Sequence, residues 1–298
     1  QETKIVSLQA VKKNEPTTAE FTKVDLTTGV ELEGARLKVM DKDGNVIDEW
    51  TSEKDKPHVI KRLVVGETYT LHEEFAPYGY LKATDVTFTV KDTAEVQKVE
   101  MKDEVPKGLL IINKKGEFLE KITLLDNVKG TVEHFFEYIT GNLSEVTFEV
   151  YAAEDIKAAD GVSADHYKKD ELVGTITTDE KGIAKMEDLP VGKYYVKEMK
   201  TEHGFVLDGE PRFVDLTYRD QDTPVVTFDE EWQNNRQKIK VTVLKKEKDT
   251  ERMLEGAIFG LFTKEDIKGR DGKVLMEAGT LIEQKSTDEN GQILFKAD

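Results

Sequence analysis

The sequence predicts an all-β protein made of β-sandwich domains in tandem. Short segments rich in Val, Thr, Phe and Tyr alternate apolar and polar residues, and turns containing Gly, Asn or Asp separate them. Examples are Arg36–Met40 before the turn Lys42–Asn45, and Gly174–Thr178 before the turn Asp179–Gly182. Strands at this spacing are typical of sandwiches. Internal repeats also divide the chain into successive units.

The composition limits the classes of partner. The 298 residues leave room for two or three domains, and 38% hydrophobic with 35% charged residues indicates several small cores. A formal net charge of −17 disfavours binding to nucleic acid or to anionic lipid. The sequence has no apolar run of about 18 residues, so we expect no membrane insertion in this segment. We expect a monomer.

Cysteine is absent, which excludes disulfides and thiolate zinc sites in this segment. The protein is therefore either cytosolic or exported and stabilised by crosslinks that do not use sulfur. We expect no metal and no cofactor, because metal-ligand spacing is missing among the five histidines His58, His72, His134, His166 and His203.

Repeated segments set the unit boundaries. Lys23 and Lys245 each stand nine residues before a Leu-Glu-Gly triplet. Phe148–Ile156 also matches Phe259–Ile267 in sequence. The prediction is a first domain over 17–106, a second over 107–236 and a truncated third over 237–298, with 1–16 as the last strand of a preceding domain.

The second unit carries an insertion near 117–143. The distance from Lys114 to Phe148 is 34 residues, whereas the equivalent distance from Lys245 to Phe259 is 14. Within the insertion, apolar residues recur at offsets of three, four and seven, which favours a short helix over 127–143. These residues are Val132, Phe135, Phe136 and Ile139.

Three polar residues of the first unit fall on the apolar faces of predicted strands. Glu73 shares a face with Tyr69 and Leu71, and Lys23 and Asp103 sit in similar positions on the first and last strands. Burying a lysine and two acids as independent charges is unfavourable. The sequence therefore predicts that these three side chains meet.

The second unit repeats the arrangement with Lys114, Glu198 and Asn234. Asp103 and Asn234 each precede the next unit's lysine by eleven residues. The neighbouring Asn235 is the alternative acceptor if the strand register shifts by one residue.

One reaction removes the unfavourable burial of charge. Burial lowers the pKa of a lysine and raises that of a carboxylic acid, so a neutral amine meets a protonated acid. The amine of Lys23 or Lys114 is then a nucleophile, and Glu73 or Glu198 polarises the acceptor carbonyl and carries protons. The product is a side-chain amide, formed with loss of water from Asp or of ammonia from Asn. Each domain reacts once, so the protein is not a turnover enzyme.

Two further residues belong to incomplete sites. Lys245 is the donor lysine of the third unit, whose glutamate and acceptor we expect beyond this sequence. Asn14 is an acceptor remaining from the preceding unit.

The stretch Tyr69–Tyr80 (YTLHEEFAPYGY) resembles the glutamate-box motif of Cna protein B-type domains, also called SpaA-like or transthyretin-like. These domains occur in Gram-positive adhesins and pilins. Lys23–Ala35 is similar to their donor-lysine strand, whereas Thr201–His203 departs from the usual Ala-Pro-x turn. The resemblance covers nearly the whole chain and implies seven-stranded Greek-key sandwiches with intramolecular Lys–Asp/Asn isopeptide bonds.

The resemblance implies an extracellular stalk or repeat region of a wall-attached surface protein. A sorting signal and a pilin-polymerisation motif are both missing here, which favours an adhesin stalk over a pilus shaft subunit. The alternative function is a ligand-binding module, with the insertion at 117–143 contacting a host matrix protein or glycan. Neighbouring domains of the same chain are the other expected partners.

Three other readings of the sequence are weaker. Glu73 and Glu74 are adjacent in a strand and point to opposite faces, so they do not form a glycosidase pair. Asp41–Asn45 reads as a hairpin turn, because it lacks the bidentate acid of a calcium loop. We interpret Trp50 and Trp232 as packing residues.

Overall fold

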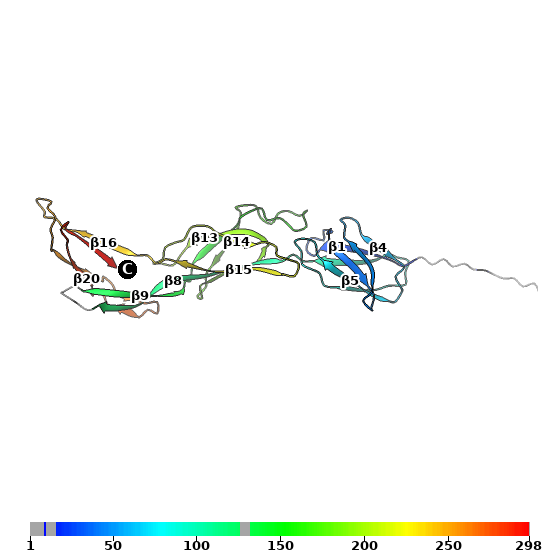
Figure 1. Ribbon diagram of the computed structural model, residues 1–298, viewed down its shortest axis with the longest axis horizontal. Coiled ribbons are helices and arrows are strands. Elements are labelled where there is room, and N and C mark those ends of the chain that lie inside the picture. The colour runs from blue at the N-terminus through cyan, green and yellow to red at the C-terminus, as the bar shows by residue number, and fades with distance from the viewer. Residues whose placement is uncertain (1–8, 10–15, 126–131, 298) are drawn as a thin grey trace, which may run out of the picture.

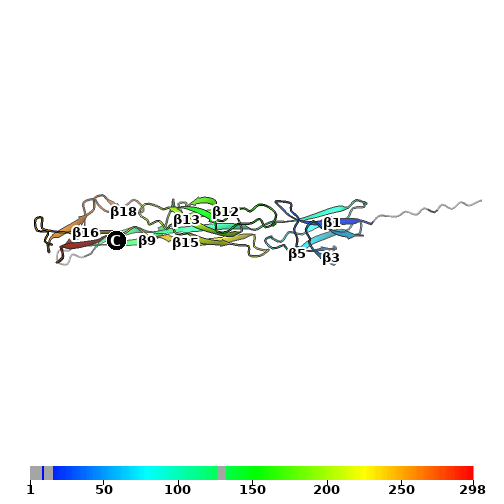
Figure 2. The same ribbon diagram turned by 90° about the horizontal axis from the view of Figure 1, so that it is seen from above.

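The computed structural model describes residue 9, residues 16–125 and residues 132–297. The units follow one another along the long axis of an extended molecule, in both views (Figures 1 and 2). Every regular element in the described ranges is a β-strand, so the all-β tandem-sandwich prediction is confirmed. Residue 14 and nearly all of 1–16 lie outside the described residues, and so does the proposed last strand of a preceding domain.

The first unit is a sandwich of a three-stranded and a four-stranded sheet. The smaller sheet has the order β4 (His58–Lys61), β1 (Thr18–Asp25) and β7 (Gln97–Asp103). The larger sheet has the order β3 (Val46–Thr51), β2 (Arg36–Met40), β5 (Thr68–Phe75) and β6 (Val86–Thr89). Alternate residues of each strand point inward, and they bury a core that includes Phe21, Val39 and Leu71.

The second unit repeats this topology. Its smaller sheet has the order β12 (Ile183–Pro190), β8 (Lys107–Leu125) and β15 (Val225–Asn234). Its larger sheet has the order β11 (Leu172–Thr177), β10 (Thr147–Ala152), β13 (Gly192–Lys200) and β14 (Arg212–Leu216). In both units the first strand pairs in parallel with the last, β1 with β7 and β8 with β15.

The predicted helix in the insertion is wrong. Residues 133–142 form strand β9 (Glu133–Asn142), which pairs antiparallel with the distal half of β8. Aromatic and β-branched residues make up half of β9 and favour a strand, and residues such as Ile122 and Phe136 pair across the two strands. In this segment the content of strand-favouring residues therefore indicates the secondary structure better than the spacing of apolar residues by three and four. Residues 127–131 of the expected helix lie outside the described residues.

The third unit repeats two strand pairings of the other units, namely β1 with β4 (β8 with β12 in the second unit) and β2 with β3 (β10 with β11). β16 (Ile239–Leu244) pairs with β21 (Gln292–Ala297), and β17 (Ile258–Phe262) pairs with β20 (Leu281–Ser286). A short hairpin of β18 (Ile267–Lys268) and β19 (Val274–Met276) lies between them.

The β8–β9 hairpin reaches out of the second unit and lies beside the third (Figure 1). The Gln284 backbone N–H donates to the Val132 carbonyl at 3.1 Å, and His134 Nδ1 lies 2.8 Å from the Ile282 carbonyl oxygen. Arg270 donates to the Asn142 carbonyl at 2.7 Å, and its guanidinium lies 4.3 Å from the centre of the Phe118 ring. The insertion thus joins two units.

The first two units meet through the turn that follows β5. Gln221 Oε1 accepts a hydrogen bond from the Ala76 N–H at 2.9 Å, and the Gln221 carbonyl accepts one from the Lys82 N–H at 3.0 Å. The Tyr218 hydroxyl donates to the Tyr80 carbonyl at 3.1 Å, and the Tyr218 and Tyr78 rings are 4.9 Å apart. The glutamate-box turn therefore also forms an interdomain contact.

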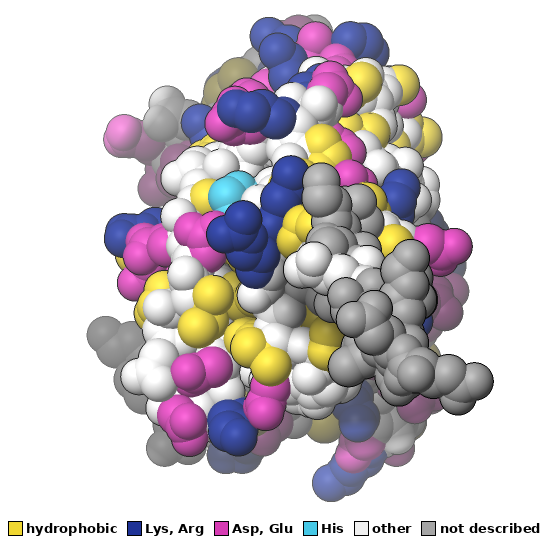
Figure 3. Space-filling view, turned by 90° about the vertical axis from the view of Figure 1, so that its right-hand side faces the viewer, with side chains coloured by type: hydrophobic (Ala, Val, Ile, Leu, Met, Phe, Trp, Pro, Cys, Tyr) yellow, Lys and Arg dark blue, Asp and Glu magenta, His cyan; other side chains and the backbone are white. Residues whose placement is uncertain are grey.

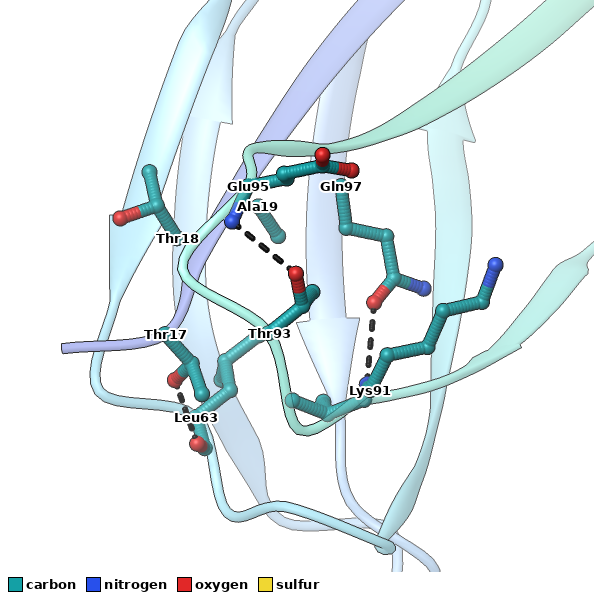
Figure 4. Close-up of a pocket in the computed structure, with 9 residues that line it drawn as sticks. Thr17, Thr18, Ala19, Leu63, Lys91, Thr93, Glu95 and Gln97 are labelled. Carbon is teal, nitrogen blue, oxygen red and sulfur yellow. Dashed lines mark hydrogen bonds between the residues drawn. The ribbon is translucent and has the colours of Figure 1, made fainter. Parts of the chain in front are cut away.

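The end of the first unit that carries Thr17 is closed by its own loops. Acidic and basic side chains are interspersed over this end face, with small groups of hydrophobic side chains between them (Figure 3). A cavity beneath it measures only about 10 Å³, between the start of β1, the loops bearing Leu63 and Lys91, and Gln97 at the start of β7 (Figure 4). That volume is about the smallest that holds one water, so this cavity is too small for a larger ligand.

No helix in the described ranges has the length and hydrophobicity needed to cross a membrane.

Candidate functional site

The predicted polar residues of the first unit meet between its two sheets. Lys23 on β1 and Asp103 on β7 come from the smaller sheet, and Glu73 on β5 comes from the larger one. Lys23 Nζ lies 2.9 Å from Glu73 Oε1 and donates to Asp103 Oδ1. All three side chains are at most 1% exposed. The parallel register of β1 and β7 places Asp103 opposite the residue two positions after Lys23.

The second unit brings its three residues together in the same way. Lys114 Nζ on β8 lies 2.7 Å from Glu198 Oε2 on β13, and Asn234 Nδ2 on β15 donates to Glu198 Oε1 at 2.5 Å. Asn234 again lies opposite the residue two positions after the lysine. Asn234 is 1% exposed whereas Asn235 is exposed, so the register favours Asn234 as the acceptor.

Backbone hydrogen bonds fix the equivalent lysine of each unit in the same place. The carbonyls of Lys23 and Lys114 accept hydrogen bonds from the N–H groups of Leu32 and Leu143, at 2.8 and 2.9 Å. In the third unit the Lys245 carbonyl accepts from the Leu254 N–H at 3.1 Å. The Lys245 side chain is exposed, unlike those of Lys23 and Lys114.

Burial disfavours the charged forms at these sites. It raises the pKa of Asp103 to about 7, while the Lys23 ammonium opposes this shift and the Glu73 carboxylate adds to it. Burial also lowers the pKa of Lys114, although the Glu198 carboxylate acts in the opposite direction. The first shift favours the neutral form of Asp103 in the first unit, and the second favours the neutral amine of Lys114 in the second unit.

Several polar oxygens at the two sites are buried without a hydrogen-bond donor. They are Glu73 Oε1, Asp103 Oδ2, Glu198 Oε2 and Asn234 Oδ1. Glu73 Oε1 and Glu198 Oε2 contact the lysine nitrogens at ion-pair distance, but the angles are not those of hydrogen bonds. Such partial satisfaction is unfavourable in a core and is typical of functional residues.

Water has little room at either site. The space beside Lys114, enclosed by Phe148, Arg212 and Trp232, does not hold a water molecule. A space beside Lys23, on the side of β3 and β4, measures about 10 Å³. Trp50 and Trp232 pack at these walls, with Phe21 and Phe148 respectively, as the sequence predicted.

The other residues considered in the sequence lie elsewhere. His58 and His72 contact the carboxylates of Asp48 and Asp85, at 2.9 and 2.7 Å. In the described ranges no group of three acidic or histidine side chains is placed to hold a metal ion. The Asp41–Asn45 segment is a hairpin turn in which Asp41 accepts hydrogen bonds from the Asp43 and Asn45 N–H groups.

Two residue pairs near the sites were not identified from the sequence. In the first unit the Tyr80 hydroxyl donates to Asp25 Oδ2 at 2.8 Å, and both residues are buried. The equivalent positions in the second unit are Phe205 and Gly116, and a Cβ on Gly116 would lie 2.3 Å from the Phe205 ring. The sequence spacing could have identified both pairs. Asp25 and Gly116 each stand two residues after the lysine of their unit, and Tyr80 and Phe205 each stand seven residues after the glutamate.

One solved structure shares the fold of this chain. The Bacillus anthracis TIE protein aligns over 95% of this chain and 43% of its own, with 21% identity and a TM-score of 0.60. This chain therefore spans less than half of that protein. The minor pilin GBS52 of Streptococcus agalactiae aligns over 74% of this chain and 96% of its own, with 13% identity and a TM-score of 0.29.

The sequence comparisons give the family. No curated protein matches the sequence. A family model for the SpaA prealbumin-like fold domain matches residues 17–105 and 138–232, and these two matches cover more than half of the chain. The resemblance inferred from the glutamate-box motif is thereby confirmed: the chain belongs to the SpaA family of prealbumin-like fold domains.

Proposed function

We propose that this chain is part of the stalk of a Gram-positive, wall-attached surface protein, and that isopeptide bonds form within its sandwiches. The proposed units are 17–106, 107–236 and 237–298, and the proposed location is extracellular. The observation that carries the proposal is the recurrence of one buried Lys–Glu–Asp/Asn cluster in two units, at the same strand register. A single buried ion pair is common in structural proteins, whereas the repeated cluster favours a shared reaction.

The proposed bonds join Lys23 to Asp103 and Lys114 to Asn234. In each unit the neutral lysine amine attacks the acceptor Cγ, and the neighbouring glutamic acid transfers protons between the amine and the leaving group. The leaving group is water from Asp103 and ammonia from Asn234. Fixed strand positions supply the effective concentration of the amine, and the dry core limits competing hydrolysis. Each bond forms once, without turnover.

A crosslink between the first and last strands suits a stalk. These strands pair in parallel, so a pulling force on the chain ends acts on them directly. A covalent bond between them stops either sandwich from extending when the chain is pulled. The two interdomain contacts, at Gln221 and at the β8–β9 hairpin, support the same role.

Peptide mapping tests the assignment. Digestion of the purified protein should release one branched peptide that joins Lys23 to Asp103 and another that joins Lys114 to Asn234. Fragmentation then identifies the bonded residues. Recovery of all four residues in linear, unmodified peptides would contradict the proposal.

The second candidate function is binding of a host matrix protein or glycan. One observation favours it: a cavity of about 340 Å³ lies between the hairpin and the third unit, lined in part by Phe118, Ile139, Arg270 and Leu275. This volume is within the range of ligand sites. A solid-phase binding screen should compare the wild type with Ile139→Trp, which fills the cavity, and with Val162→Trp, an exposed control outside it. Binding that survives Ile139→Trp, or no binding at all, would contradict a ligand site there.

A further inference from the structure

We propose that Thr201 is a further catalytic residue of the second unit, required because the acceptor there is an amide and not an acid. This inference rests on the isopeptide reaction proposed for Lys114 and Asn234. Thr201 Oγ1 accepts a hydrogen bond from Asn234 Nδ2 at 2.9 Å, so it touches the atom that leaves. Thr201 follows β13 directly and is half-buried.

The chemistry of the acceptor explains the need for this contact. A side-chain amide carries two N–H donors, and a buried donor without a partner is destabilising. Glu198 Oε1 accepts one N–H of Asn234, at 2.5 Å, and Thr201 Oγ1 accepts the other. With both N–H groups held, the plane of the amide is fixed relative to Lys114 Nζ.

The first unit supplies a natural comparison. Thr201 stands three residues after Glu198, and the residue three after Glu73 is Ala76, which has no side-chain acceptor. The first unit's acceptor, Asp103, has no N–H to satisfy. The unit whose acceptor is an amide therefore has a hydroxyl at this position to accept its N–H, and the unit whose acceptor is an acid has none.

The reaction balances with these groups alone. The lone pair of neutral Lys114 Nζ attacks Asn234 Cγ and forms the N–C bond, and the Cγ–Nδ2 bond breaks. The proton that Nζ loses passes to Glu198, which gives a proton to Nδ2. Nδ2 leaves with its own two hydrogens and that proton, as ammonia. Thr201 Oγ1 holds one of those hydrogens throughout and so keeps Nδ2 oriented toward the acid.

The test follows bond formation during refolding of denatured, unbonded chain, by intact mass. Thr201→Val keeps the shape of the side chain and removes the acceptor, and we expect it to slow loss of ammonia by about tenfold. Thr201→Ser should restore the rate. Loss of water by the first unit should stay unchanged in both variants, which provides an internal control for folding and handling.

A second background separates catalysis from stability. In Asn234→Asp the second unit must lose water, the acceptor has no N–H, and Thr201→Val should change its rate by less than about twofold. A tenfold slowing in both backgrounds would show a structural role and overturn the proposal, as would an unchanged rate in the Asn234 background. Absence of ammonia loss in the wild type would instead contradict the isopeptide function itself.

Discussion

Lys114 Nζ lies 2.7 Å from Glu198 Oε2, although neither side chain is more than 2% exposed. Lys23 and Glu73 stand in the same relation in the first unit, at 2.9 Å. Taking such a pair out of water is unfavourable unless mutual attraction and further hydrogen bonds offset the lost hydration. The proposed amide would remove the lysine charge, and with it the cost of burying that charge.

The two proposed bonds should form with different pH dependences. The reactive form of the first site holds two protons among three groups: neutral Lys23, and protonated Glu73 and Asp103. Burial raises the pKa of Asp103 to about 7, so its protonated form is present below that pH and is lost as the pH rises through it. Loss of water should therefore slow by up to about tenfold per pH unit above about pH 7.

The second bond provides the control for this pH effect, because its acceptor is an amide and does not titrate. The protein is refolded at about pH 6, 7 and 8, and samples are quenched with acid. The intact mass of each sample then reports loss of water and loss of ammonia in one spectrum. Loss of ammonia should not show the same decline. A parallel decline of both reactions would contradict the assignment to Asp103.

Tyr80→Phe should destabilise the first unit. The change removes the hydrogen bond to Asp25 and leaves a buried carboxylate oxygen with one donor fewer. The free energy of unfolding should fall by about 1.5–3 kcal/mol, as measured by urea denaturation. Tyr78→Phe is the matched control, because the Tyr78 side chain is 85% exposed, and we expect less than about 0.5 kcal/mol. Equal effects would show that the Asp25 contact contributes nothing.

Gly116→Ala should destabilise the second unit. An added Cβ would lie 2.3 Å from the Phe205 ring, so the ring or the strand must shift. Overpacking of this kind costs about 1–3 kcal/mol, measurable by thermal unfolding. Gly209→Ala is the control, since its Cβ would meet no atom within 4 Å. A stability unchanged by Gly116→Ala would mean that Phe205 does not pack as described.

The hairpin should hold the third unit in place. Arg270→Ala removes the hydrogen bond to Asn142 and the contact with the Phe118 ring. We expect greater motion between the second and third units, measurable as a broader distance distribution between spin labels placed on each. Arg252→Ala, at an exposed ion pair with Glu247, should leave the distribution unchanged. An unchanged distance distribution in Arg270→Ala would show that other contacts hold the second and third units together.

The sequence predicted much of this arrangement because side chains alternate along strands. Lys23, Glu73 and Asp103 were predicted to point inward because their neighbours on the same strand faces are apolar. The internal repeats then identified the equivalent residues of the second unit. The insertion was predicted wrongly, because its pairing with β8 is a tertiary effect that the residue spacing does not record. The joint at Gln221 was also missed, because it depends on how two units approach each other.

The intact mass of the purified protein tests the central claim most directly. The wild type should be lighter than its sequence by one water and one ammonia together. Glu73→Gln should regain only the water and Glu198→Gln only the ammonia, because each glutamate acts in its own unit. A wild-type mass equal to that of the sequence would contradict the account, and the buried lysines would then be ordinary ion pairs.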